Sequence, residues 1–275
     1  MSGSSTAAGG PTTATQPLMA GKRGLIMGVA NDHSIAWGIA DHLHRHGAKL
    51  AFTYQSEALG RRVHPLASLV GSEFVVPCDV SEPGSIKAAF DFVSDHWPSI
   101  DFVVHAIAYS DKEELNGKYI DTSRKNFLQT LDISCFSFTE VAQRAAQWMP
   151  DGGSLLTLTY DGSHRVMPNY NVMGVAKAAL EASVQYLATD LGGQGVRVNA
   201  ISAGPMRTLA GSAIGGARFV YKWQGENAPL RRHVALEDIG GAGIYLLSDL
   251  SAAVTGETLY VDCGYHVVGM AKTPA

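Results

Sequence analysis

Short apolar runs alternate with stretches of helical spacing along almost the whole chain. The apolar runs are continuous, which is typical of strands whose two faces are both covered, and they predict strands at residues 23–30, 48–54, 73–80, 101–108, 154–160, 196–203 and 257–263. Between them, apolar side chains recur three or four residues apart, as on one face of a helix. This spacing predicts helices at residues 34–46, 57–69, 85–96, 122–149, 170–191 and 236–248.

The alternation of strands and helices predicts an α/β fold of one domain. Strands separated by helices pair in parallel through right-handed crossovers. Seven strands, with a phosphate-binding type of turn after the first, favour a Rossmann-type, doubly wound parallel sheet over the alternative, an eight-stranded barrel. No internal linker divides the chain, so residues 21–268 are expected to form the domain. Residues 1–20, which carry no charged side chain, and residues 269–275 are expected to be flexible tails.

Composition and charge exclude several classes of protein. The chain has 46% hydrophobic residues and a net charge of −4, from 21 Lys and Arg against 25 Asp and Glu. Without a basic surplus, no nucleic-acid partner is expected, and without an apolar run of about 18 to 20 residues, no membrane span is expected. The three cysteines, Cys78, Cys135 and Cys263, form no CxxC pair. Free thiols suit a reducing compartment, so the cytoplasm is the expected location.

The turn after the first strand has features of a dinucleotide site, although it lacks the usual GxGxxG motif. Gly28 lets the chain turn sharply away from the strand, and Ser34 stands where the next helix begins. A helix N-terminus attracts a pyrophosphate, to which a serine hydroxyl can also donate. The alternative is that Ser34 only caps the helix, since serine is among the commonest N-cap residues.

The end of the second strand bears on the choice of nucleotide. Many NAD-binding folds place an acidic residue here, whereas NADP-binding folds supply an arginine nearby. Gln55 is neither, Glu57 would repel a 2′-phosphate, and Arg61 and Arg62 follow only later in the next helix. NAD(H) is therefore favoured over NADP(H).

A tyrosine and a lysine near the start of the helix over residues 170–191 form a candidate catalytic pair. Tyr170 and Lys177 are seven residues apart, which places them on one helix face two turns apart. The ammonium can hold a nicotinamide ribose and favour proton donation from the phenol, which can stabilise an oxygen that gains negative charge. Tyr160 ends the preceding strand and is expected to line the same site. The alternative is that Tyr160 only fills the core.

Several segments of the chain resemble the bacterial enoyl-acyl-carrier-protein reductases, a divergent branch of the short-chain dehydrogenase/reductases. The resemblance covers residues 21–268 and rests on Gly28…Ser34-Ile35-Ala36, Phe52-Thr53-Tyr54-Gln55, Cys78-Asp79-Val80, His105-Ala106-Ile107, Tyr170-x6-Lys177 and the segment Val198 to Pro205. The Tyr-x6-Lys spacing is specific, because the wider superfamily has Tyr-x3-Lys. The resemblance implies reduction of the trans-2 double bond of enoyl-acyl-carrier-protein thioesters by NADH in fatty acid biosynthesis. It also implies acyl carrier protein as the partner and a homotetramer as the assembly.

The same resemblance implies a role for each residue of the site. The cofactor would be bound by Gly28, Ser34, Ile35, Gln55, Asp79, Val80, Ala106, Lys177, Met206 and Thr208. The catalytic residues would be Tyr160, Tyr170 and Lys177, with Tyr170 on the thioester carbonyl. The substrate would contact Ala108, Ser110, Tyr160, Tyr170, Leu209, Ile214 and Phe219. Residues 208–222 would form a mobile flap over the acyl chain, and the glycines in this segment suit a loop that moves.

Two other functions and two other sites compete with this interpretation. A carbonyl (3-oxoacyl) reductase of the same superfamily would favour Tyr-x3-Lys, and a non-catalytic dinucleotide sensor would need no proton donor. His42 and His46 are one helical turn apart, but no third ligand is evident, so no metal site is expected. Asp161, Ser163 and His164 could mimic a hydrolase triad, but no GxSxG motif supports one.

Overall fold

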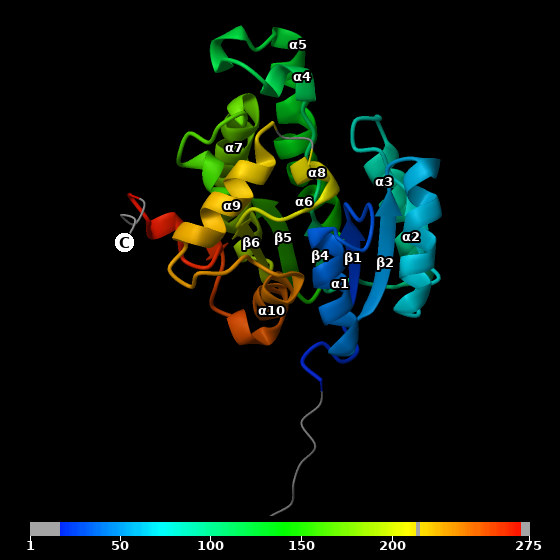
Figure 1. Cartoon of the computed structure of the whole chain (residues 1–275). Coiled ribbons are helices and arrows are strands. Elements are labelled where there is room, and N and C mark those ends of the chain that lie inside the picture. Colours follow the sequence, from blue (N-terminus) through cyan, green and yellow to red (C-terminus); the bar gives the residue numbers. More distant parts are fainter. Residues whose placement is uncertain (1–16, 213–214, 271–275) are drawn as a thin grey trace, which may run out of the picture.

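The computed structural model describes residues 17–212 and 215–270, and in that part of the chain seven parallel strands form one sheet (Figure 1). Their order is β3-β2-β1-β4-β5-β6-β7, so the chain moves outward from β1 on one side and from β4 on the other. This order confirms the predicted doubly wound sheet and excludes the barrel. The strands are β1 (Arg23–Met27), β2 (Lys49–Tyr54), β3 (Val75–Pro77), β4 (Phe102–His105), β5 (Gly153–Thr159), β6 (Val196–Ala203) and β7 (Thr258–Val261).

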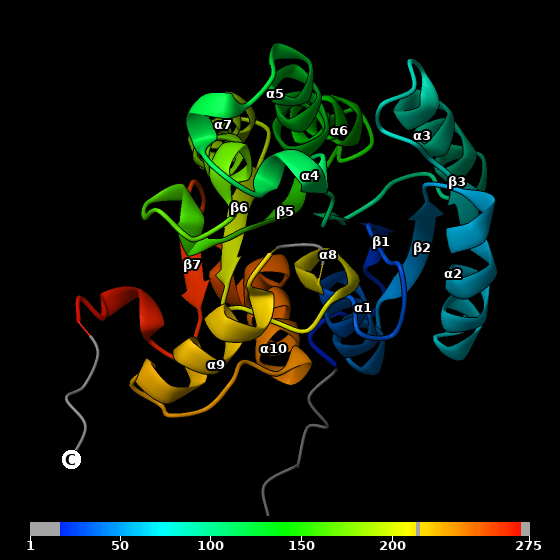
Figure 2. The same ribbon diagram turned by 45° about the horizontal axis from the view of Figure 1, so that its top comes forward.

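Helices cover both faces of this sheet (Figure 2). Successive residues of a strand face opposite ways, so Ile26 packs with the helices α1, α2 and α10, whereas Leu25 packs with α3, α6 and α7. The helices are α1 (Ile35–Arg45), α2 (Glu57–Leu69), α3 (Ser85–His96), α4 (Lys112–Leu115), α5 (Arg124–Leu131), α6 (Ser137–Ala146), α7 (Asn171–Gly192), α8 (Leu209–Ser212), α9 (Ala217–Asn227) and α10 (Leu236–Leu247). Among the described residues, no helix combines the length and the hydropathy that a membrane crossing requires.

The helix predicted over residues 122–149 differs from the prediction in one respect. It contains a π-helical turn at Asp132–Phe136, which separates α5 from α6. Within this turn the Ser134 hydroxyl binds both the N–H (2.9 Å) and the carbonyl (3.0 Å) of Tyr109 in the loop after β4. The Ser137 hydroxyl donates to the carbonyl of Ile133 at 2.7 Å. Apolar spacing does not report such side-chain bonds, so the π turn was not predicted.

A matched pair of leucines tests the predicted core. Leu43 of α1 is fully buried, whereas Leu69 of α2 is 73% exposed. Leu43→Ala is expected to lower the free energy of unfolding by about 2–5 kcal/mol, because a buried leucine leaves a cavity when it is truncated. Leu69→Ala should change it by less than about 0.5 kcal/mol. Urea unfolding of both variants measures the difference, and equal losses would contradict this assignment of the core.

Candidate active site

The candidate site lies at the carboxyl ends of β1 and β4, where the strand order reverses. Gly28 follows β1 with a φ of +99°, a conformation that favours glycine. A β-carbon at this position would lie 2.1 Å from the carbonyl oxygen of Ala106, which follows β4. Only glycine therefore allows the turn to pass this closely beside Ala106. Open α/β sheets bind their ligands at such a reversal point.

Ser34 closes the turn that leads into α1. Its hydroxyl accepts hydrogen bonds from the N–H groups of Ala30 (3.0 Å) and Asn31 (3.1 Å). In the described part of the chain it makes no hydrogen bond to the first turn of α1, so Ser34 occupies the N-cap position without side-chain capping. The positive end of the helix is thus left facing the turn, which suits an anion such as pyrophosphate. Ile35, the next residue, packs against the core.

Gln55 and Asp79 meet at the ends of β2 and β3. The Gln55 amide donates to the Asp79 carboxylate at 2.6 Å, and Ser81 donates to the same carboxylate through its N–H (2.9 Å) and its hydroxyl (2.7 Å). Although partial burial acts in the opposite direction, the hydrogen bonds from Ser81 and Gln55 lower the pKa of Asp79. The charged carboxylate can accept a bond from an amino group such as that of adenine. Val80 packs beside it, partly buried.

Lys177 is buried in the second turn of α7, with 6% of its surface exposed. Its ammonium donates to the carbonyl oxygen of Leu158 on β5 at 2.7 Å. Burial lowers the pKa of Lys177 to about 8, while the nearby Cys135 and Glu181 act to raise it. The lysine is therefore charged at neutral pH and retains further N–H donors for a ligand.

Tyr170 and Tyr160 lie against each other at the start of α7. Their rings meet edge to face, with centroids 5.2 Å apart at an angle of 78°. Burial raises the pKa of both phenols, so both keep their proton at neutral pH. Among the described residues the buried Tyr160 hydroxyl has no hydrogen-bond partner. The structure thus places Tyr160 beside the candidate proton donor.

His105, at the end of β4, is a buried neutral residue near Lys177. It is fully buried and lies 3.2 Å from the Thr157 hydroxyl and 2.8 Å from the Ser137 hydroxyl. Burial, helped by the charge of Lys177, lowers the pKa of His105 to about 3. The lysine therefore faces an uncharged histidine across the range in which most enzymes work.

The residues predicted to contact the substrate lie on three segments. Ser110, in the loop after β4, accepts from the Thr130 hydroxyl at 2.9 Å, and the same loop is held by Asn126 of α5, which accepts from the N–H of Asp111 at 3.0 Å. Ala108, in the same loop, is exposed. Leu209 of α8 is 52% exposed, Phe219 of α9 is 63% exposed and stacks on Trp223, and Ile214 lies outside the described residues. Two residues predicted for the cofactor lie in the same part of the chain: Met206 packs on the core, and the Thr208 hydroxyl accepts from the N–H of Gly211.

Most of the chain matches one family of known proteins. The family model described as "Enoyl-(Acyl carrier protein) reductase" matches residues 28–266. The chain belongs to this family. It is 65% identical to the enoyl-[acyl-carrier-protein] reductase [NADH] 2 of Rhizobium meliloti (strain 1021), over 92% of this chain and 94% of that protein.

Two solved structures of the enoyl-acyl-carrier-protein reductase family have nearly the same fold. The FabI structure of Candidatus Liberibacter asiaticus is 58% identical, with a TM-score of 0.92, over 94% of this chain and all of that one. The reductase of Anaplasma phagocytophilum, solved in complex with NAD, is 57% identical, with a TM-score of 0.91, over 94% of this chain and 99% of that one.

Some residues around this reductase-family site were not found from the sequence. Glu181, four residues after Lys177, is buried and accepts hydrogen bonds from the last side chain of β5 and from two side chains of the β5–α7 connection. Asn169, next to Tyr170, donates to the carbonyl of Gly215 at 2.8 Å and so links this connection to the predicted flap. The spacing from Lys177 could have drawn attention to Glu181, because residues four apart share a helix face.

The competing sites are arranged differently from a triad or a metal centre. Ser163 and His164 both hydrogen-bond to Glu181, and Asp161 lies 3.8 Å from the Arg165 guanidinium. In α1, the His42 ring lies 3.0 Å from the carbonyl oxygen of Gly38, and the His46 ring lies 2.8 Å from that of His42. The helix backbone therefore occupies one nitrogen of each ring.

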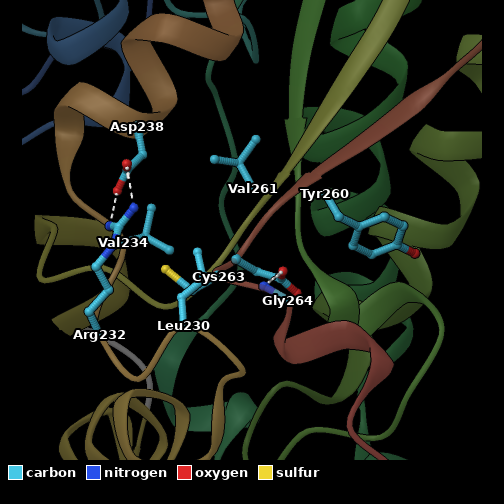
Figure 3. Close-up of a pocket in the computed structure, with 9 residues that line it drawn as sticks. Leu230, Arg232, Val234, Asp238, Tyr260, Val261, Cys263 and Gly264 are labelled. Atoms are coloured by element: carbon cyan, nitrogen blue, oxygen red, sulfur yellow. Dashed lines mark hydrogen bonds and ion pairs between the residues drawn. The ribbon is translucent and has the colours of Figure 1, made fainter.

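A pocket opens at the carboxyl end of β7 (Figure 3). Its lining includes an ion pair in which the Arg232 guanidinium binds the Asp238 carboxylate at 2.5 and 2.8 Å. The residues that line it are Leu230, Arg232, Val234, Asp238, Tyr260, Val261, Asp262, Cys263 and Gly264. This pocket contains none of the residues predicted for the cofactor or the substrate.

Proposed function

We propose that this chain reduces the trans-2 double bond of enoyl thioesters carried by acyl carrier protein, with NADH as the reductant, in fatty acid biosynthesis. The observation that carries the proposal is that Tyr170 and Lys177 are both buried at the start of α7, where the Tyr170 ring meets Tyr160 edge to face. The family to which the chain belongs, and the word NADH in the name of its relative at 65% identity, support the same activity.

Each residue of the pair has a distinct part in this reaction. NADH, when bound, supplies the hydride that adds to the β-carbon of the enoyl group. Negative charge then develops on the thioester oxygen, where the Tyr170 hydroxyl can donate a hydrogen bond, and the enolate finally takes a proton from water at the α-carbon. The Lys177 ammonium holds the ribose and favours that donation. In a ketone the hydride lands on the carbonyl carbon, whereas in an enoyl thioester it lands on the β-carbon, which is two bonds further from the carbonyl oxygen. This displacement explains why the phenol stands one helical turn further from the lysine than in ketone reductases.

The turn after β1 and the ends of β2 and β3 fit a dinucleotide. Gly28, Ser34 and Ile35 are assigned to the pyrophosphate, and Gln55, Asp79 and Val80 to the adenosine. Ala106, Lys177, Met206 and Thr208 are assigned to the nicotinamide half. The charged Asp79 carboxylate beside Gln55 would repel a 2′-phosphate, which supports NADH over NADPH. Ala108, Ser110 and residues 208–222, with Leu209, Ile214 and Phe219, are assigned to the acyl chain.

A comparison of two thioesters tests the proposed function. NADH oxidation is expected with a trans-2-enoyl thioester of acyl carrier protein and not with the corresponding 3-oxoacyl thioester. Activity on the 3-oxoacyl thioester alone would establish a carbonyl reductase instead. NADH binding without turnover of either thioester would establish a dinucleotide sensor.

The pH dependence should report the ionisation of Lys177. Since its pKa is lowered to about 8, the ammonium is charged at pH 7 and loses its proton as the pH rises through 8. We therefore expect kcat/KM to fall on the alkaline side with a midpoint near pH 8. In Lys177→Arg, whose guanidinium stays charged, that alkaline fall should disappear from whatever activity remains. A wild-type profile that stays flat up to pH 10 would contradict this assignment.

We also infer that four copies of the chain associate, and that α6 and α7 contribute to their contact. A groove on the outer side of these helices includes Phe136, which is 55% exposed, and Leu187, and neighbouring Tyr186 is 76% exposed. Exposed apolar side chains of this kind mark protein interfaces. Phe136→Asp is expected to reduce the mass measured by light scattering. A wild-type mass of one subunit would contradict the tetramer.

The cytoplasm is the compartment that we infer for this reaction. All three cysteines are free and buried, which suits a reducing environment.

A further inference from the structure

Glu181 forms a buried hydrogen-bonding centre with side chains on either side of Tyr160 in the sequence. Only 8% of its surface is exposed. One carboxylate oxygen accepts from the Thr159 hydroxyl and the Ser163 hydroxyl, both at 2.5 Å, and the other lies 2.7 Å from a ring nitrogen of His164. The carboxylate therefore has a partner on each oxygen.

The residues that hydrogen-bond to Glu181 lie on both sides of Tyr160 along the chain. Thr159 immediately precedes it at the end of β5, and Ser163 and His164 belong to the short turn that follows it. Glu181 itself lies on α7, one helical turn beyond Lys177. One side chain thus joins the segment that carries Tyr160 to the helix that carries Lys177.

We propose that Glu181 is a positioning residue for enoyl reduction: its carboxylate fixes the Tyr160 turn on α7 and places a negative charge beside the catalytic pair. This inference rests on the proposed function, because it assigns Glu181 a part in the same reaction. A buried carboxylate is costly to dehydrate, and a well-packed apolar side chain often costs less at such a site. Stability alone therefore does not explain a glutamate at this position. Its hydrogen bonds to two hydroxyls and an imidazole do explain it, because they hold the Tyr160 turn in place.

Close backbone packing makes the two tyrosines sensitive to the position of this turn. A β-carbon on Gly162, within the turn, would lie 2.5 Å from the Tyr170 ring, and one on Gly174 of α7 would lie 2.6 Å from the carbonyl oxygen of Gly162. A small shift of the turn would therefore move the Tyr170 ring or open the edge-to-face contact with Tyr160. Shifts of about 1 Å at a reacting group can cost 10²-fold in rate.

The charge of Glu181 also acts on both members of the pair. It raises the pKa of Lys177, against the effect of burial, and it adds to the effect of burial in raising the pKa of Tyr170. The other titratable or charged groups nearby are Cys135 of the π turn, His105 of β4, Tyr160, Asp161, His164 and Arg165 of the β5–α7 connection, and Tyr260 of β7. Removing the charge of Glu181 should therefore shift the dependence of activity on pH. Loss of a purely structural residue would leave that dependence unchanged.

Glu181→Gln is the direct test, since it keeps the size of the side chain and removes the charge. We expect kcat to fall about 10-fold, because the turn that carries Tyr160 is no longer fixed and the two tyrosines act on the thioester. The alkaline limb of the pH profile should move to lower pH, because Lys177 loses the anion that helps to keep it protonated. Glu237→Gln, an exposed glutamate on α10, is the charge-matched control and should behave like the wild type.

A second variant separates the two parts of the inference. Ser163→Ala removes one hydroxyl and leaves the charge, so kcat should fall several-fold while the alkaline limb stays in place. If circular dichroism shows that Glu181→Gln does not fold, the double variant Ser163→Ala/His164→Gln tests the same hydrogen bonds between the Tyr160 turn and Glu181. Full kcat in that double variant, or a folded Glu181→Gln enzyme with an unmoved alkaline limb, overturns the proposal.

The wild-type enzyme in the same assays shows whether a failure concerns Glu181 or the reaction. If the wild type turns over only the 3-oxoacyl thioester, the proposed function fails. The kcat values of the variants and of the wild type are then compared on that substrate. Equal kcat values overturn the role of Glu181 separately.

Discussion

Lys177→Met should lower kcat/KM for an enoyl thioester by about 10²–10³-fold, the loss typical of removing one preorganised donor from a catalytic site. The substitution keeps most of the side-chain volume and removes a buried ammonium that donates to the carbonyl of Leu158 at 2.7 Å. Steady-state kinetics measure the loss. NADH binding followed by fluorescence should weaken as well, because the ammonium is the group assigned to the ribose.

Lys177→Arg is the control for charge. The guanidinium stays protonated but is planar and larger, so the buried position should accept it poorly and recover only part of the activity. If Lys177→Met binds NADH normally and loses less than about 3-fold in kcat/KM, the lysine is structural and the catalytic assignment is wrong.

The sheet could be predicted from the sequence because every strand is an apolar run bounded by polar turns. Leu25 and Ile26 pack on opposite faces of the sheet, and both need an apolar environment. A short, continuous apolar run between two helices is typical of a strand that is covered on both faces. The strand order was not predicted, and only the structure places the reversal between β1 and β4, where a doubly wound sheet binds its ligand.

The details of the site depended on contacts between distant segments, which spacing does not report. The Ser34 hydroxyl accepts hydrogen bonds from the N–H groups of Ala30 (3.0 Å) and Asn31 (3.1 Å), which belong to the turn before it. Glu181 was overlooked because its partners, Thr159, Ser163 and His164, are 17 to 22 residues away. Only the folded β5–α7 connection brings these hydroxyls to the carboxylate. The Tyr–Lys pair was found because both of its members lie at the start of one helix.

Loss of the hydroxyl of Tyr170, the candidate proton donor, is expected to cause the second large fall in activity. Tyr170→Phe removes one hydroxyl and leaves the ring that meets Tyr160 edge to face, so the fold of the site should be unchanged. We expect kcat for an enoyl thioester to fall about 10²-fold, which is within the range for losing a general acid or an oxyanion donor.

The same hydroxyl deletion at Tyr160 distinguishes the two tyrosines. Burial raises the pKa of both phenols, but Tyr170 is the N-cap residue of α7, seven residues before Lys177, whereas Tyr160 stands before the short turn that follows β5. If Tyr170 stabilises the charge on the thioester oxygen, Tyr160→Phe should lose much less activity than Tyr170→Phe. Equal losses would mean that the two hydroxyls act together on the substrate. A loss confined to Tyr160→Phe would transfer the donor role to Tyr160, and the spacing from Lys177 would then have no catalytic meaning.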